Sequence, residues 1–369
     1  MMHGVASATA TERFRQRCAG VDPTHFRPLQ DLWASSIGLG TYLGDADEAT
    51  DARYREAIRT ALTSGCNLID TAINYRCQRS ERVLGDALES LCAQDLVARD
   101  EVILCTKGGY LPFDGTVPAD PDRYVTEAFI NSGLASYEEI VAGCHCLAPS
   151  FLDAALQTSL ANLRVQTIDL YYLHNPEQQL DEVSRDVLAA RLEAAFALLE
   201  QRVQDGTLRY YGIATWQGLR VNPSSKGYLS LESLVALAKR LAGDAHHFRA
   251  IQLPYNLAMP EAAVFKNQAV GGELLSVLEA AQRLGLSVMT SAGLLQGQLT
   301  RLPASFTQRI PGAFTPAQRA VQFARSTPGV TTALIGMKQR AHVEEILALA
   351  RHPLLDAEAI HRLYDRSRR

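Results

Sequence analysis

From residue 35 onward, short apolar runs alternate with longer amphipathic runs, and this alternation limits the folds open to the chain. Short apolar runs suit buried strands, and apolar residues recurring at intervals of three and four suit helices. The expected strands are Ser35–Leu39, Asn67–Ile69, Val102–Thr106, Ile168–Leu173, Leu208–Ile213, Ala250–Leu253, Leu286–Thr290 and Thr331–Ile335. The expected helices lie near residues 51–64, 80–94, 150–164, 187–204, 229–242, 271–284, 315–325 and 340–350.

Eight strands, each followed by a helix, predict an α/β fold of the (β/α)8 or TIM-barrel type. A doubly wound open sheet would give a similar alternation with fewer strands. Against it, the first expected strand is not followed by the Gly-rich GxGxxG turn of a dinucleotide-binding domain. We expect one barrel over residues 35–350, an N-terminal extension over residues 1–34 and a C-terminal tail over residues 351–369.

One connection is far longer than a barrel needs. Residues 108–149 separate the third expected strand from its helix, whereas most such loops hold about two to six residues. This insertion is rich in glycine, proline and aromatic residues rather than in charge. Its aromatic residues suit an apolar lid over the barrel mouth, the core of a small subdomain, or a subunit contact: Tyr110, Phe113, Tyr124, Phe129 and Tyr137.

Composition and charge argue against several classes of function. The formal net charge of −4 provides no positive field to attract nucleic acid. No run approaches the roughly 18 apolar residues of a membrane span, and residues 1–20 lack the apolar core of a secretory signal. The 7 cysteines are an odd number scattered along the chain, as is usual for reduced thiols. We therefore expect a cytoplasmic protein without membrane or nucleic-acid partners.

The cysteine cluster Cys144-His145-Cys146 has a poor spacing for a metal site. One residue between the cysteines does not match a zinc-finger pattern, and no second ligand pair follows it. We expect a packed loop at this position and no metal.

Polar side chains stand where consecutive expected strands end. Asp70 follows the second strand, Lys107 the third and His174 the fourth, while Tyr75 lies five residues after Asp70. Strand ends meet at the C-terminal mouth of a barrel, so we expect these four side chains to converge. Taken singly, each also has an ordinary structural role, as a helix cap, a core residue or a solvated amine.

Together these residue types suit the reduction of a carbonyl group. Asp70 can hold the ammonium of Lys107, which would then lower the pKa of Tyr75 from about 10 and make its phenol a usable general acid. His174 can donate a hydrogen bond to the carbonyl oxygen and orient the substrate. No side chain supplies hydride, so this chemistry implies a nicotinamide cofactor.

Several segments resemble the aldo-keto reductase family. They are IGLGTYLG (37–44), NLIDTAINY (67–75), CTKGG (105–109), IDLYYLHNPE (168–177), IQLPYNL (251–257) and LIGMKQRAHVEEIL (334–347). The resemblance covers roughly residues 35–350, interrupted by the insertion, and implies a divergent member of the family. It places the family's catalytic tetrad on Asp70, Tyr75, Lys107 and His174. It also implies reduction of a small aldehyde or ketone with NADPH, or with NADH as the alternative cofactor.

The resemblance extends to cofactor and substrate contacts. The implied cofactor-binding residues are Gly40, Thr41, Thr215, Gln252, Ser291, Leu294, Gly336, Lys338, His342 and Glu345. The implied substrate-facing residues are Tyr42, Trp216 and Tyr110. Gln252 matches the residue that binds the nicotinamide carboxamide, and Lys338 could pair with a 2′-phosphate, which would favour NADP over NAD.

Other positions depart from the family pattern. Ala214 and Thr215 stand where the family usually has a Ser-Asn pair, Ser291 replaces a stacking tyrosine, and Ile346 replaces an amide. These departures weaken the expected cofactor contacts. They leave two alternatives open: a redox-neutral isomerase or dehydratase on the same scaffold, and a non-catalytic cofactor-sensing subunit. No pattern in the sequence indicates an oligomeric state.

Overall fold

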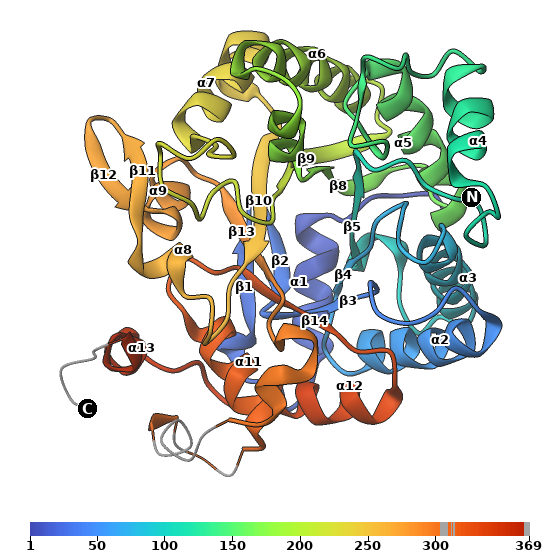
Figure 1. Ribbon diagram of the computed structural model, residues 1–369. Helices are drawn as coiled ribbons and strands as arrows, with labels where there is room; N and C mark the ends of the chain where they lie inside the picture. The colour runs from blue at the N-terminus through green and yellow to red at the C-terminus, as the bar shows by residue number, and fades with distance from the viewer. Residues whose placement is uncertain (303–308, 311, 313, 365–369) are drawn as a thin grey trace.

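A closed barrel of 8 parallel strands lies at the centre of the computed structural model, which describes residues 1–302, 309–310, 312 and 314–364 (Figure 1). In chain order the barrel strands are β3 (Ile37–Gly40), β4 (Leu68–Asp70), β5 (Ile103–Gly108), β8 (Ile168–His174), β9 (Leu208–Ala214), β10 (Phe248–Pro254), β13 (Ser287–Ser291) and β14 (Thr332–Gly336). The barrel closes where β14 pairs with β3 in parallel, with Leu334 opposite Gly38. Each expected strand overlaps one of these, so the predicted (β/α)8 fold is confirmed.

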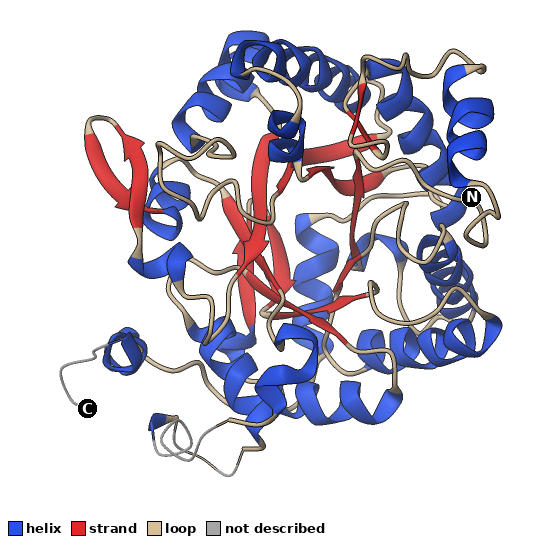
Figure 2. Cartoon of the chain, in the orientation of Figure 1, coloured by secondary structure: helices blue, strands red, loops and turns tan. Residues whose placement is uncertain are grey.

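Helices surround the barrel on its outer side (Figure 2). They are α2 (Glu48–Thr63), α3 (Arg79–Ala93), α5 (Pro149–Leu163), α6 (Arg185–Gln204), α7 (Leu231–Ala242), α9 (Val277–Arg283), α11 (Pro316–Ser326) and α12 (Arg340–Leu347). Five of them begin where a side-chain oxygen accepts the backbone N–H three residues on, as helix-capping residues do. The capping residues are Asp47, Ser184, Ser230, Ser276 and Thr315.

The helix expected over residues 271–284 is wrong in its first part. The structure has a hairpin there, β11 (Lys266–Val270) with β12 (Glu273–Ser276), preceded by the short α8 (Glu261–Val264). Gly271 and Gly272 form its turn with φ of 60° and 83°, which glycine adopts without strain. The helix begins only at Val277. The helix expected over residues 340–350 likewise ends at Leu347 and continues as a 3-10 turn, Ala348–Arg351.

The N-terminal extension closes one end of the barrel. It contains α1 (Ala8–Arg17) and an antiparallel hairpin of β1 (Phe26–Leu29) and β2 (Leu32–Ser35). Leu29 and Leu32 of the hairpin are buried in one apolar cluster with Leu68, Ile103 and Met289 of barrel strands. Burying an aliphatic side chain of this size contributes about 1.5–3 kcal/mol, so the hairpin stabilises the closed end.

The insertion folds into short elements that pack beside α5 (Figure 1). They are α4 (Pro121–Val125), a π-helical turn (Thr126–Ile130) and a hairpin of β6 (Ile140–Val141) and β7 (His145–Cys146). A run of edge-to-face ring contacts links Phe113, Tyr124, Phe129 and Phe151 of α5, with centroids 5.5, 6.1 and 5.7 Å apart. For Phe113, Tyr124 and Phe129, this packing favours the core of a small subdomain over an apolar lid.

The C-terminal segment is helical over α13 (Ala357–Tyr364). Ile360 is buried, and the Tyr364 hydroxyl contacts that of Tyr255, which follows β10. Residues 365–369 lie outside the described residues. Within the described part of the chain, no helix has the length and apolar character needed to cross a membrane. All 7 cysteines are free thiols.

Candidate active site

Asp70, Lys107 and Tyr75 form a buried contact at the C-terminal end of the barrel. Asp70 ends β4 and Lys107 lies in the neighbouring β5. The Lys107 Nζ donates hydrogen bonds to Asp70 Oδ1 at 2.5 Å, to the Thr71 carbonyl oxygen at 2.7 Å and to the Tyr75 hydroxyl at 3.2 Å. These three acceptors use all three protons of the ammonium, so the Tyr75 hydroxyl lies against a fixed positive charge.

His174 ends β8 on the other side of Tyr75. The two ring centroids lie 5.9 Å apart with an interplanar angle of 76°. The Tyr110 ring meets His174 edge-on from the insertion at 4.9 Å. The Nδ1 atom of His174 is buried and has no hydrogen-bond partner among the described residues.

Burial and the fixed charges set the ionisation of these groups. Burial lowers the pKa of Lys107, but Asp70 and Tyr75 outweigh it and the pKa lies above its ordinary value. For His174, burial and then the cationic Lys107 bring the pKa well below its ordinary value, so the imidazole is neutral near pH 7.

The expectation that Lys107 brings the pKa of Tyr75 below its ordinary value is wrong for this structure. Lys107 does lower the pKa, but burial of the phenol raises it by more, and the net shift is upward. The phenol therefore remains protonated at neutral pH. That is the state a general acid requires before it gives up its proton.

A cavity of about 900 Å³ opens beside these groups. All the predicted catalytic, cofactor and substrate residues line it except Lys107, which is fully buried beneath it. Tyr42 lies against Tyr75 with ring centroids 5.1 Å apart, Tyr110 lies against His174, and Trp216 lines the same cavity. Lys338 lines the cavity from the β14–α12 connection, and His342 and Glu345 line it from α12, so one continuous space joins the two groups.

Four of the predicted cofactor residues already use their side chains in hydrogen bonds within the protein. The Thr41 hydroxyl donates to the Asp70 carbonyl oxygen at 3.3 Å. Gln252 Nε2 donates to Asp70 Oδ2 at 2.7 Å. The Thr215 hydroxyl donates to Glu177 Oε1 at 2.5 Å, and Glu345 Oε1 accepts from the Thr315 hydroxyl at 2.7 Å. Gly40, Thr41, Ser291, Leu294 and Gly336 complete the predicted cofactor lining.

A profile described as "Aldo/keto reductase family" matches residues 36–301. The chain belongs to the aldo/keto reductase family. Among curated relatives of this family member, a 6-dehydroglucose reductase of Novosphingobium aromaticivorans is 29% identical over 200 residues, 53% of this chain and 52% of that protein. The aldo-keto reductase YhdN of Bacillus subtilis is 32% identical over 150 residues, 39% of this chain and 35% of that protein. These matches cover about half or less of the relatives' length.

Solved structures share the fold of this family member. A Klebsiella pneumoniae aldo/keto reductase in complex with NADP and acetate has a TM-score of 0.61 at 20% identity, covering 92% of this chain and 94% of that chain. The holo form of aldo-keto reductase AKR11C1 from Bacillus halodurans has a TM-score of 0.61 at 21% identity, covering 94% of this chain and 100% of that chain.

Sequence reasoning missed a role for Glu177, although this residue lies in the segment IDLYYLHNPE. Its buried Oε1 accepts the backbone N–H groups of Trp216, Gln217 and Gly218 at 2.9, 3.0 and 3.2 Å, besides the Thr215 hydroxyl. Glu177 therefore holds the turn that carries Trp216 into the cavity wall. Only its place directly after the strand-four motif hinted at such a role.

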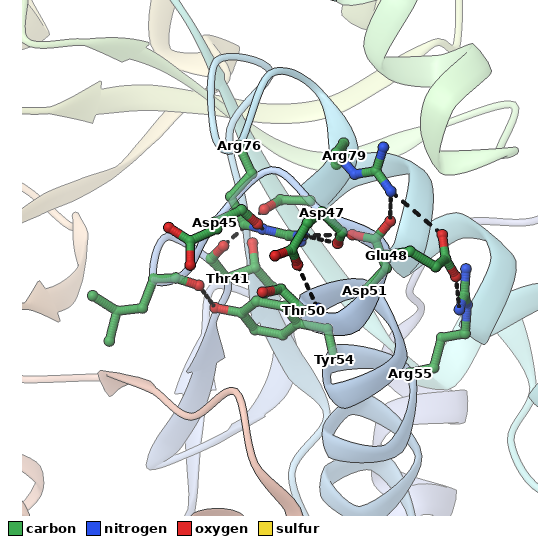
Figure 3. A network of polar contacts seen from close by, with 12 residues as sticks. Thr41, Asp45, Asp47, Glu48, Thr50, Asp51, Tyr54, Arg55, Arg76 and Arg79 are labelled. Carbon is green, nitrogen blue, oxygen red and sulfur yellow. Dashed lines mark hydrogen bonds and ion pairs between the residues drawn. The ribbon is translucent and has the colours of Figure 1, made fainter. Parts of the chain in front are cut away.

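The segment after Tyr75 also went unrecognised. Arg76, Cys77 and Gln78 have φ of 51°, 54° and 69°, a left-handed conformation that costs a non-glycine residue about 1–2 kcal/mol. The buried guanidinium of Arg76 donates to the carbonyl oxygens of Asp45 and Asp47 at 2.7 and 3.2 Å (Figure 3). Arg76 thereby ties the loop after β3, which includes Tyr42, to the segment that carries Tyr75.

Arg76 is also one half of a buried ion pair at the start of α2. Its Nη2 lies 2.5 Å from Asp51 Oδ1, and Arg79 contacts the second oxygen of the same carboxylate (Figure 3).

We expect Arg76→Lys to lower the free energy of unfolding by about 1–2 kcal/mol, because an ammonium keeps the charge but cannot reach all three acceptors. Denaturant unfolding measures the loss, and hydrogen exchange should show faster exchange over residues 41–47. Arg55→Lys is the matched control, since Arg55 pairs with Glu48 on the exposed face of α2. An equally small loss of stability in both variants would contradict the role of Arg76 in tying the two loops together.

Proposed function

We propose that this chain reduces an aldehyde or ketone to an alcohol with hydride from NADPH. The observation that carries the proposal is the buried Asp70–Lys107–Tyr75 contact facing His174 across one end of the cavity. A structural ion pair alone would not require a tyrosine hydroxyl and a neutral imidazole in the same cavity wall. The small-molecule carbonyl substrate would lie among Tyr42, Trp216 and Tyr110.

The donor set of the cavity fits a nicotinamide dinucleotide. At the β14–α12 end, Lys338 lines the cavity and has no carboxylate partner among the described residues. Among the described residues, no side chain caps the N-terminus of α12, and free N–H groups at a helix start favour anions such as phosphate. At the other end Gln252 offers an amide beside the catalytic groups. The bound cofactor would supply the hydride, and the Klebsiella pneumoniae relative was crystallised with NADP.

The residues of the chain would then bind, orient and protonate the substrate. The neutral His174 would donate a hydrogen bond to the carbonyl oxygen and orient it toward Tyr75. The Tyr75 phenol would give its proton to the developing alkoxide oxygen. Lys107, which is held by Asp70, would stabilise the phenolate left behind.

One observation favours a second candidate function, that of a redox-neutral isomerase or dehydratase. The Thr215 hydroxyl donates to Glu177, and Ala214 has neither a hydroxyl nor an amide. The end of β9 therefore offers few hydrogen-bonding groups to the carboxamide of a nicotinamide. That reading predicts catalysis by Tyr75 and His174 without consumption of a nicotinamide. A non-catalytic cofactor-sensing subunit predicts binding without turnover.

A nucleotide titration followed by tryptophan fluorescence tests the proposal. Trp216 lines the cavity and is 51% exposed, whereas Trp33 lies in β2 at the closed end of the barrel. We expect NADPH to quench the emission at micromolar concentration and NADH to quench it more weakly. Trp33→Phe should keep the quenching. A panel of aldehydes and ketones then tests for oxidation of NADPH.

We expect Lys338→Met to raise the Kd for NADPH about tenfold, because one charge-assisted contact to a phosphate is lost. The Kd for NADH should change by less than about twofold, since NADH lacks the 2′-phosphate. Lys266→Met, at an exposed position of the hairpin strand β11, is the matched control and should change neither. Failure of the wild-type protein to bind either nucleotide would contradict the reductase proposal. Binding without oxidation by any carbonyl would favour the cofactor-sensing alternative.

A further inference from the structure

The Cys144-His145-Cys146 segment lies directly behind the catalytic histidine. His145 belongs to β7 of the insertion and is fully buried. Its Nε2 lies 2.7 Å from the backbone carbonyl oxygen of His174. A carbonyl oxygen can only accept, so Nε2 carries the proton. The Nδ1 atom is then an acceptor, and Gln179 Nε2 donates to it at 2.7 Å.

This histidine is the middle of a chain of hydrogen bonds that reaches α6. The Gln179 Oε1 atom accepts a hydrogen bond from Arg191, and Arg191 Nη2 donates to the Glu138 carbonyl oxygen of the insertion at 2.6 Å. Burial lowers the pKa of His145 to about 4, so its ring stays neutral and keeps one tautomer at physiological pH. The hairpin is therefore anchored on both sides of His145.

The insertion reaches the ring of His174 as well as its backbone. Tyr110 lies edge-on to both histidines, with centroids 5.0 Å from His145 and 4.9 Å from His174. A Cβ atom on Gly109 would lie 2.9 Å from the His174 carbonyl oxygen and 3.0 Å from His145 Nε2. Gly109 therefore lies too close to the end of β8 and to β7 for any side chain at this position.

His174 lacks the contact that usually fixes a catalytic imidazole. Such a ring is commonly oriented by a hydrogen bond at the nitrogen facing away from the substrate. Here Nδ1 has no partner among the described residues. The orientation of the ring is therefore set by its backbone and by packing against Tyr75 and Tyr110. The backbone pairs with Ala214 of β9, and the insertion adds Tyr110 and the contact of His145 with the His174 carbonyl oxygen.

We propose that His145 is a positioning residue for His174, and that this is the function of the insertion's β6–β7 hairpin. The inference rests on the carbonyl reduction proposed above. His145 fixes the end of β8 through the His174 carbonyl and holds Tyr110 against the ring. Its loss therefore tilts the hydrogen-bond donor away from the substrate's carbonyl oxygen without changing the acid that protonates it.

Two variants of His145 and one control test this role. His145→Leu removes both ring nitrogens, whereas His145→Gln keeps an N–H donor near the position of Nε2. His25→Leu is the control: His25 is also fully buried, with Nε2 3.0 Å from the Gly65 carbonyl oxygen and Nδ1 3.0 Å from the Ser36 hydroxyl. It does not line the cavity.

We expect His145→Leu to lower kcat/KM for a carbonyl about tenfold to a hundredfold, as loss of substrate orientation does, with the Kd for NADPH unchanged within about twofold. His145→Gln should recover most of the loss. In ¹⁵N-histidine NMR spectra the ring signals of His174 should move in His145→Leu, return in His145→Gln and stay in place in His25→Leu.

Wild-type kcat/KM in His145→Leu, or unmoved His174 signals, would overturn the proposal. An equal loss of activity in His25→Leu would overturn it too, because both losses would then follow from general destabilisation. The NMR comparison needs no substrate. If the wild-type protein turned over no carbonyl, the proposed function would fail while the effect of His145 on His174 would still be decided.

Discussion

Replacing Tyr75 by Phe should lower kcat for carbonyl reduction by about 10²–10⁴-fold, the usual contribution of a general acid. The substitution removes one oxygen and keeps the ring that lies over the Lys107 ammonium and beside Tyr42. Lys107 still has Asp70 and the Thr71 carbonyl as acceptors, so no buried charge is left without a partner. The Kd for NADPH should therefore stay within about twofold of wild type.

Tyr171→Phe is the matched control for this change. Tyr171 is fully buried in β8, does not line the cavity, and its hydroxyl has no partner among the described residues. Loss of that hydroxyl should leave kcat unchanged. Steady-state kinetics and the fluorescence titration together separate chemistry from binding. Wild-type turnover by Tyr75→Phe would remove the general-acid role from Tyr75.

The sequence predicted those parts of the fold whose signals are local. Each barrel strand is a short run of buried apolar residues between turn residues, and such runs can be recognised without knowledge of their partners. The same reasoning places Asp70, Lys107 and His174 at one mouth, because parallel strands in a barrel all end on the same side. The hairpin β11–β12 was not predicted because Leu274 and Leu275 suit a helix as well as a strand.

Features that depend on burial and distant contacts could not be predicted in this way. The upward shift in the pKa of Tyr75 depends on how completely the folded chain covers its hydroxyl. The roles of Arg76 and Glu177 depend on backbone groups of other segments, which no spacing reveals. His145 was recognised as part of a packed loop, but its contact with the His174 carbonyl follows only from the fold of the insertion.

Lys107→Met should lower kcat about 10²–10³-fold and also destabilise the protein, by about 3–5 kcal/mol near pH 7. The methionine fills the space of the lysine but leaves the Asp70 carboxylate buried, with Gln252 as its remaining hydrogen-bond donor. Denaturant unfolding and steady-state kinetics measure the two effects. Lys239→Met is the control, because Lys239 forms an exposed ion pair with Asp244, and such pairs contribute about 0–1 kcal/mol. Turnover of Lys107→Met at the wild-type rate would exclude the role assigned to the ammonium.

The loss of stability in Lys107→Met should depend on pH in a direction that identifies its cause. Burial raises the pKa of the Asp70 carboxyl, and Lys107 opposes that rise, so removing Lys107 raises the pKa further. The folded variant then holds a proton that the unfolded chain has lost above about pH 4, and its stability falls as pH rises through the raised pKa. Its deficit against wild type should be smallest near pH 4 and largest at neutral pH. Adding Asp70→Asn removes the buried charge and should restore most of the stability but none of the turnover. A double variant as unstable as Lys107→Met would show that lost packing, rather than an unpaired carboxylate, causes the deficit.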